Sequence, residues 1–211
     1  MILYTRELDT FKGYNQRYSE NSKLFEIYAN AQKFLDQIIS LMKFNFPVSV
    51  LEVGCGQGDY LALFKEKLIS HNLIHQDSRF IGLDGSTAAI KQCEEKYPEQ
   101  LWIGDSVQKF LLDPRASQFD NNIDILMNKG GTTFIEDEEE CREILTNKKR
   151  LLKPGGIFCW FISKSFYDDS WIKKTSMKDW NKDFMSLAKE VFPVYTVFDN
   201  PGVYAIIFHN I

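Results

Sequence analysis

The sequence predicts an α/β protein with a doubly wound, mostly parallel sheet, helices on both faces and a C-terminal antiparallel hairpin. Short β-branched runs alternate with segments of helical periodicity between residues 48 and 191. Strands that alternate with helices imply parallel pairing through right-handed crossovers. Near the end, two apolar runs flank Asp-Asn-Pro-Gly at residues 199–202, a sequence typical of a hairpin turn.

The first half of the chain alternates between helix and strand signals. Apolar residues three and four apart predict helices, and β-branched runs closed by glycine predict buried strands. In chain order these are a helix over 23–43, a strand over 48–53, a helix over 60–68, a strand over 79–84, a helix over 87–97 and a strand over 101–103. Pro47 and Pro98 end two of the helices, because proline disfavours helical geometry in the residue before it.

The second half continues the alternation up to the hairpin. In order it contains a strand over 123–127, a helix over 137–152, a strand over 157–162, a helix over 176–191 and strands over 194–198 and 203–208. The helix over 137–152 begins with acidic and ends with basic residues, which suits its dipole. Pro154, Gly155 and Gly156 then turn the chain into the next strand.

Size and composition fit a single soluble domain. We expect residues 1–211 to form one domain, with an N-terminal lid and helix over 1–44 and the α/β core over 45–211. Hydrophobic residues make up 44% of the chain and charged residues 26%, which is ordinary for a globular protein. There is no apolar run of roughly 20 residues and no signal-peptide pattern at the start, so the expected location is cytoplasmic.

Glycines follow the first predicted strand at Gly54, Gly56 and Gly58. Ligands of a doubly wound sheet bind beyond the carboxyl ends of its strands, and glycine lets the backbone approach them closely. A ligand-free glycine turn is the alternative. A dinucleotide fingerprint would read G-x-G-x-x-G, whereas here the third glycine follows the second by two residues and Asp59 comes next. A nicotinamide oxidoreductase therefore fits less well.

Acidic residues follow the next two strands. Asp84, with Gly85 and Ser86 after it, could accept hydrogen bonds from both hydroxyls of a ribose. Asp105, followed by Ser106, could accept a hydrogen bond from an adenine amino group. Taken alone, an aspartate at a strand end is more often a helix N-cap. Their position at the same edge as the glycine loop favours a nucleoside site.

This set of motifs resembles that of the class I S-adenosylmethionine (SAM)-dependent methyltransferases. The likeness rests on Val-Leu-Glu-Val-Gly-Cys-Gly-Gln-Gly at 50–58, Asp84, Gly104-Asp105, the run 124–128 and Leu-Leu-Lys-Pro-Gly-Gly at 151–156. The final hairpin is similar to the family's reversed last strand. The resemblance covers about residues 45–208 and implies a Rossmann-like domain that binds SAM and releases S-adenosylhomocysteine (SAH).

The resemblance also implies the cofactor-binding residues. These are Glu52, Gly54, Gly56, Asp84, Gly85, Ser86, Asp105, Ser106, Asn128 and Lys129. The two glycines would face the methionine part of SAM, with Glu52 supporting their loop. The residues at 84–86 would hold the ribose, those at 105–106 the adenine, and those at 128–129 would line the methyl-transfer side. Residues 128–135 depart from the family because they lack the acidic or His residue that many relatives carry there.

No catalytic side chain and no metal ligand is predicted. The four cysteines are widely spaced, and His71 and His75 lie in a polar stretch that is better explained as a solvated connection than as a zinc site. Methyl transfer from a sulfonium can proceed through alignment of the reactants, so positioning can provide most of the acceleration.

A small-molecule acceptor is expected, because no large substrate domain separates the fifth strand from the hairpin. The residues that could shape its pocket are Tyr14, Tyr18, Phe166, Tyr167 and Trp171, although aromatic side chains also commonly pack at the edge of a core. The net charge of -4 argues against nucleic acid. An RNA or protein methyltransferase and a non-catalytic SAM-binding module remain alternatives.

Overall fold

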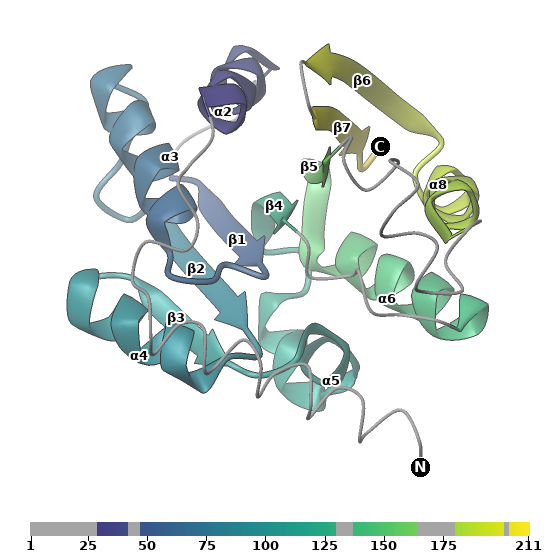
Figure 1. Cartoon of the computed structure of the whole chain (residues 1–211), viewed down its shortest axis with the longest axis horizontal. Coiled ribbons are helices and arrows are strands. Elements are labelled where there is room, and N and C mark those ends of the chain that lie inside the picture. The colour runs from purple at the N-terminus through teal and green to yellow at the C-terminus, as the bar shows by residue number, and fades with distance from the viewer. Residues whose placement is uncertain (1–28, 42–46, 130–136, 164–179, 201–202) are drawn as a thin grey trace.

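A seven-stranded sheet forms the centre of the protein (Figure 1). The computed structural model describes residues 29–41, 47–129, 137–163, 180–200 and 203–211. The strands are β1 (Ser49–Val53), β2 (Arg79–Asp84), β3 (Leu101–Gly104), β4 (Ile123–Lys129), β5 (Leu152–Ser163), β6 (Val194–Asn200) and β7 (Val203–His209). Their order across the sheet is β3-β2-β1-β4-β5-β7-β6.

The first five strands pair in parallel, and β7 pairs antiparallel with both β5 and β6. The strand order reverses between β1 and β4, which is where a doubly wound sheet opens a ligand-binding crevice. At this point Val53 of β1 lies in register with Leu83 of β2 and Asn128 of β4. The carboxyl ends of three strands therefore meet at one place.

Helices cover both faces of the sheet (Figure 1). The helical elements are α2 (Ala29–Leu41), α3 (Asp59–Ser70), α4 (Thr87–Lys96), α5 (Val107–Leu112), the 3-10 helix η1 (Pro114–Phe119), α6 (Glu138–Leu151) and α8 (Trp180–Val191). Side chains of α2, α3 and α4 build one hydrophobic cluster, and those of α5, η1, α6 and α8 build the other. The predicted architecture is confirmed.

Two short elements between β3 and β4, the helix α5 and the 3-10 helix η1, were not predicted from the sequence. Each has six residues, which is too short for a periodic apolar pattern to be recognised. Asp113 begins η1 by accepting a hydrogen bond from the backbone N–H of Arg115, and Pro114 follows it at the first helical position.

The turn predicted at residues 154–156 is a bulged start of β5. Gly155 has φ +81°, and the pairing with β4 shifts register between Ile123 and Ile125. A Cβ at Gly156 would lie 2.9 Å from the carbonyl oxygen of Lys153 and 3.1 Å from that of Ile123. This glycine is therefore required by the close approach of two backbones.

The predicted lid begins in residues 1–28, which lie outside the described part of the chain, so the division at residue 45 stays a prediction. Within the described part, none of the helices combines the length and apolar character needed to cross a bilayer. The cytoplasmic location also stays a prediction.

Candidate functional site

The loop after β1 is built from glycines in the left-handed region. The φ angles are +75° at Gly54, +53° at Gly56 and +77° at Gly58, values that glycine adopts at no steric cost. The backbone N–H groups of Gly54 and Cys55 donate to the carbonyl oxygen of Leu83 at 2.8 and 3.1 Å. The loop is thus fastened to the end of β2.

Asp84 connects this loop to the start of α4. Its Oδ2 accepts a hydrogen bond from the N–H of Gly56 at 2.8 Å, and its Oδ1 accepts one from the N–H of Ser86 at 2.8 Å. Burial raises the pKa of the Asp84 carboxyl, and the two amide donors oppose that shift. A carboxylate offers about four acceptor positions, so capacity for ligand hydroxyls remains after these two bonds.

The serines that follow the two aspartates act as helix N-caps. The hydroxyl of Ser86 is buried and accepts a hydrogen bond from the N–H of Ala89 at 3.2 Å. The hydroxyl of Ser106 accepts one from the N–H of Lys109 at 3.2 Å. Capping, proposed from the sequence as an alternative role for the aspartates, is thus carried out by the serine side chains.

Asp105 lies at the carboxyl end of β3 beside two cations. Its Oδ2 accepts a hydrogen bond from Nη2 of Arg115 at 2.8 Å, and its Oδ1 lies 3.5 Å from Nζ of Lys109. Oδ1 also accepts from the N–H of Ser106 at 2.9 Å. Arg115 was not predicted to contribute here, because it belongs to the unpredicted 3-10 helix.

Glu52 is fully buried on the face of the sheet covered by α2 and α3. Alternation along β1 places it on the same face as Val50, whose side chain belongs to that cluster. Its negative charge adds to burial in raising the pKa values of Tyr60 and Cys55. Glu52 therefore lies beneath the glycine loop, on one side of the sheet.

Asn128 faces the opposite side of the sheet and is fully buried. Its Oδ1 accepts a hydrogen bond from Nζ of Lys148 in α6 at 2.8 Å. Lys148 is also fully buried, and burial lowers its pKa to about 7. The backbone of Lys129 ends β4 beside Asn128, and its side chain lies outside the described residues.

The candidate acceptor residues are not placed by the structure. Tyr14, Tyr18, Phe166, Tyr167 and Trp171 all lie outside the described residues and stay predictions. Of the candidate cofactor residues, those at 52–56, 84–86, 105–106 and 128–129 are brought to one edge of the sheet by the strands that precede them.

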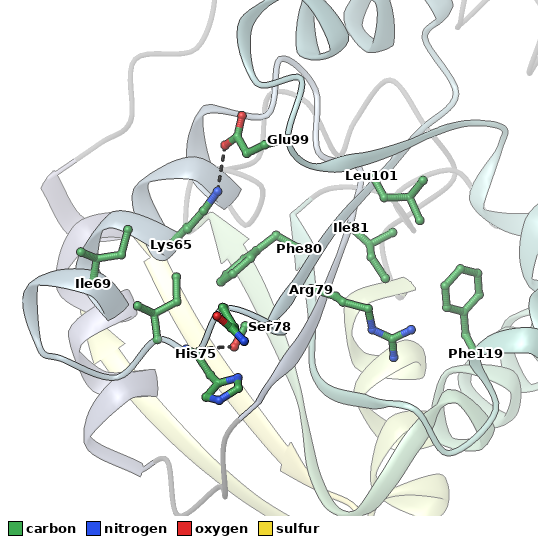
Figure 2. A pocket seen from close by; sticks show the side chains of 12 residues that line it. Lys65, Ile69, His75, Ser78, Arg79, Phe80, Ile81, Glu99, Leu101 and Phe119 are labelled. Atoms are coloured by element: carbon green, nitrogen blue, oxygen red, sulfur yellow. Dashed lines mark hydrogen bonds and ion pairs between the residues drawn. The ribbon is translucent and has the colours of Figure 1, made fainter.

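A cavity of about 640 Å³ lies at the other end of β2 and β3 (Figure 2). Phe80 and the half-exposed Leu101 form part of its wall, and Arg79 borders it at the first position of β2. Lys65 and Glu99 form an ion pair of 2.8 Å at its rim. The edge of the sheet that carries the glycines at 54, 56 and 58 and the residues at 84–86 is called here the glycine-loop edge. Since Asp84 ends the strand that Arg79 begins, this cavity lies at the opposite end of the strand from the glycine-loop edge.

The fold is that of a doubly wound α/β protein, and its candidate site lies at the carboxyl ends of β1, β2 and β4. A sheet of this order, with a glycine loop after its first strand and a carboxylate at the end of its second, is suited to a ligand that carries a ribose. A family model described as a methyltransferase domain matches residues 50–156, about half of the chain. The chain therefore belongs to this family of methyltransferase domains.

Similar proteins of known structure share the fold. The N-methyltransferase NodS from Bradyrhizobium japonicum, solved with SAH, has a TM-score of 0.63 and 15% identity and covers 95% of this chain and 98% of its own. A TehB-like SAM-dependent methyltransferase from Corynebacterium glutamicum has a TM-score of 0.60 and 16% identity, with coverages of 95% and 97%.

A curated relative is similar in sequence. The mRNA cap guanine-N(7) methyltransferase of Schizosaccharomyces pombe is 26% identical over 152 residues. The match covers 66% of this chain and 39% of the yeast protein, so the chain spans about two fifths of that relative's length.

Proposed function

We propose that the protein transfers the methyl group of SAM to an oxygen, nitrogen or sulfur atom of a small-molecule acceptor. The observation that carries the proposal is the glycine-loop edge. There, three left-handed glycines and the Asp84 carboxylate, which is bonded to the loops after both β1 and β2, lie together.

The residues at this edge fit SAM. Gly54 is half-buried and Gly56 is buried, and neither residue has a side chain that would keep a ligand away from the backbone. Asp84 retains acceptor capacity on the carboxylate for the two ribose hydroxyls. Asp105 is positioned one strand further along, where it would accept from the adenine amino group in exchange for part of its interaction with Arg115.

The chemistry requires the protein mainly to hold and align its ligands. When bound, SAM supplies a methyl group on a positively charged sulfur that leaves as a neutral thioether. Rigid anchoring of the glycine loop to Leu83 and Asp84 would fix the orientation of the donor, and alignment with the acceptor would provide most of the rate enhancement. An amine, thiol or acidic phenol would serve better than an aliphatic alcohol, which needs a general base.

The acceptor can be sought by incubating the full chain with a metabolite extract and methyl-labelled SAM, followed by mass spectrometry. We expect one class of small molecule to gain the label in a protein-dependent manner. Binding of SAM without label transfer to any compound would instead favour a non-catalytic SAM-binding module.

An RNA acceptor is the second candidate, because the S. pombe relative methylates an mRNA cap. The net charge of -4 weighs against it. Capped RNA should be included in the same labelling assay, with uncapped RNA of identical sequence as control. Label on the capped RNA alone would replace the small-molecule proposal.

A further inference from the structure

Lys148 is a fully buried lysine in the hydrophobic face of α6. It follows Cys141, Ile144 and Leu145 at spacings of seven, four and three residues, and all four side chains are buried. Burial of an ammonium group is costly, so such a group tends to lose its proton near neutral pH. Accordingly, burial lowers the pKa of Lys148 to about 7.

The amine of Lys148 has one polar and one aromatic neighbour. Its Nζ donates to Oδ1 of Asn128 at 2.8 Å and lies 4.9 Å from the centroid of the Phe158 ring. The titratable group that interacts with it on its own helix is the thiol of Cys141, whose own pKa burial raises to about 11. Within the described part of the chain, no ion pair joins Lys148 to a carboxylate.

Several charged groups on α6 and on the elements packed against it have partners of their own. Their interactions are Arg142 with Glu138 and Glu190, Arg150 with Asp120, Lys149 with the carbonyl of Val191, Lys153 with Asp124, Lys109 and Arg115 with Asp105, and Lys189 above the ring of Tyr195. The protonation of Lys148 is therefore governed mainly by its burial.

The hydrogen bond to Asn128 links this titrating amine to the glycine-loop edge. Asn128 is in register with Val53, the residue directly before Gly54. The amine thus lies one hydrogen bond away from a residue that is paired with the strand end from which the glycine loop starts. Its charge acts through a protein interior, where screening is weak.

We propose that Lys148 is a positioning residue that makes the site discriminate between SAM and SAH according to pH. This inference rests on the proposed function. SAM carries a positive sulfonium, whereas SAH has a neutral thioether, and the two ligands are otherwise alike. A charged Lys148 repels SAM and leaves SAH unaffected, while the uncharged amine keeps its hydrogen bond to Asn128 without that repulsion.

The direction of the pH effect follows from the charge of the lysine. Below about pH 7 the group is protonated and SAM binding is weakened relative to SAH. As the pH rises the amine becomes neutral and the preference shifts toward SAM. We take the Lys148 ammonium and the SAM sulfonium as unit charges about 10 Å apart, with an effective dielectric constant between that of a dry protein interior and that of water. Their repulsion then implies a change of roughly fivefold to tenfold in the ratio of the two affinities.

Calorimetric titration of the full chain with SAM and with SAH, from about pH 6 to about pH 9, tests the proposal. Taking the ratio removes the ionisation of the amino and carboxyl groups common to both ligands. Lys148→Gln keeps a donor for Asn128 without a titrating charge, and Lys148→Met removes both. Lys149→Met removes a neighbouring charge on the same helix. We expect the ratio of SAM affinity to SAH affinity to rise with pH in the parent and in Lys149→Met. In both Lys148 variants this ratio should not change with pH.

The outcomes separate this inference from the proposed function. A folded parent that binds neither ligand contradicts the function and the inference together. Binding of both ligands with a flat ratio in the parent overturns the role of Lys148 alone. The same conclusion follows if the ratio still rises in whichever Lys148 variant folds.

Discussion

Asp84 has a structural role in the fold and, under the proposed function, would also bind the ligand. It holds the N–H of Gly56 and the N–H of Ser86, each at 2.8 Å, and it ends β2 at the proposed ribose position. The remaining acceptor capacity would be used by the ligand. The loss of this carboxylate should therefore affect both the shape of the loop and the affinity for SAM.

We predict that Asp84→Ala weakens SAM binding on the order of tenfold or more, because hydrogen bonds to a charged group contribute about 1.5–3 kcal/mol. Calorimetry on the folded variant measures the loss. Asp77→Ala, at an exposed carboxylate paired with His75, is the matched control and should bind like the parent. An unchanged affinity in Asp84→Ala would show that the ribose lies elsewhere.

The buried Lys148 should also influence stability. The folded state holds its pKa at about 7, against 10.5 as the ordinary value. Below pH 7 both states are protonated and the destabilisation is complete. Above pH 7 the unfolded chain binds more protons than the folded one, so the free energy of unfolding rises with pH at ~1.4 kcal/mol per unit.

Urea denaturation at neutral and at mildly alkaline pH measures this effect. The parent should gain about 2 kcal/mol or slightly more relative to Lys148→Met between about pH 7 and about pH 9. Parallel pH dependences in parent and variant would mean that Lys148 keeps an ordinary pKa in the folded protein.

The roles of individual residues were only partly predictable from the sequence. Lys148 was assigned to a basic helix end, although its spacing from Cys141, Ile144 and Leu145 already placed it on the apolar face. Asp84 was predicted to end the second strand, and it does, but its hydrogen bond to Gly56 depends on long-range geometry. No local pattern indicates which amide a carboxylate will meet.

The glycine loop depends on its packing against β3. A Cβ at Gly58 would lie 2.5 Å from Cη2 of Trp102, and Gly58 itself begins α3 with φ +77°. The third glycine is thus explained by a neighbouring indole and by backbone conformation. This glycine contributes indirectly to the site by letting the backbone of the loop come close to the Trp102 indole.

We predict that Gly58→Ala destabilises the protein by about 1–3 kcal/mol, from the clash with Trp102 added to the backbone strain. Urea unfolding gives the loss. Gly155→Ala is the matched control, since Gly155 has φ +81° with no atom within 4 Å of an added Cβ. Equal losses of unfolding free energy at the two positions would mean that backbone strain alone explains the effect. That result would contradict a clash with Trp102.

The predictability of the elements follows from their length and regularity. The strands β1, β2 and β4 and the helix α6 were predicted to within two residues. A strand is recognisable from a short apolar run with clear ends, and α6 has 14 residues, enough to show helical periodicity. The helix α5 and the 3-10 helix η1 have too few residues for such a pattern. The start of β5 at Leu152 required knowledge of its pairing with β4.

At the scale of the whole molecule, we predict that turnover is independent of metal and of an enzyme base. No cysteine or histidine spacing in the sequence suggests a ligand set, and residues 128–135 lack an acidic or His group. Once the acceptor is known, activity should survive EDTA, and its pH profile should follow the ionisation of the acceptor.

Two acceptors of different pKa make that prediction specific. If the pH at which the rate changes stays the same for acceptors of different pKa, the titrating group belongs to the protein. Loss of turnover on chelation, with recovery on adding magnesium, would reveal a metal site.

The central claim is that the glycine-loop edge binds SAM, and parallel titrations with SAM and NADH test it most directly. We predict saturable, one-to-one binding of SAM, no saturable binding of NADH, and loss of SAM binding in a folded Gly56→Val variant, whose side chain would occupy the place of the ligand. A folded parent that fails to bind SAM, a preference for NADH, or parent-like binding by Gly56→Val would contradict the account.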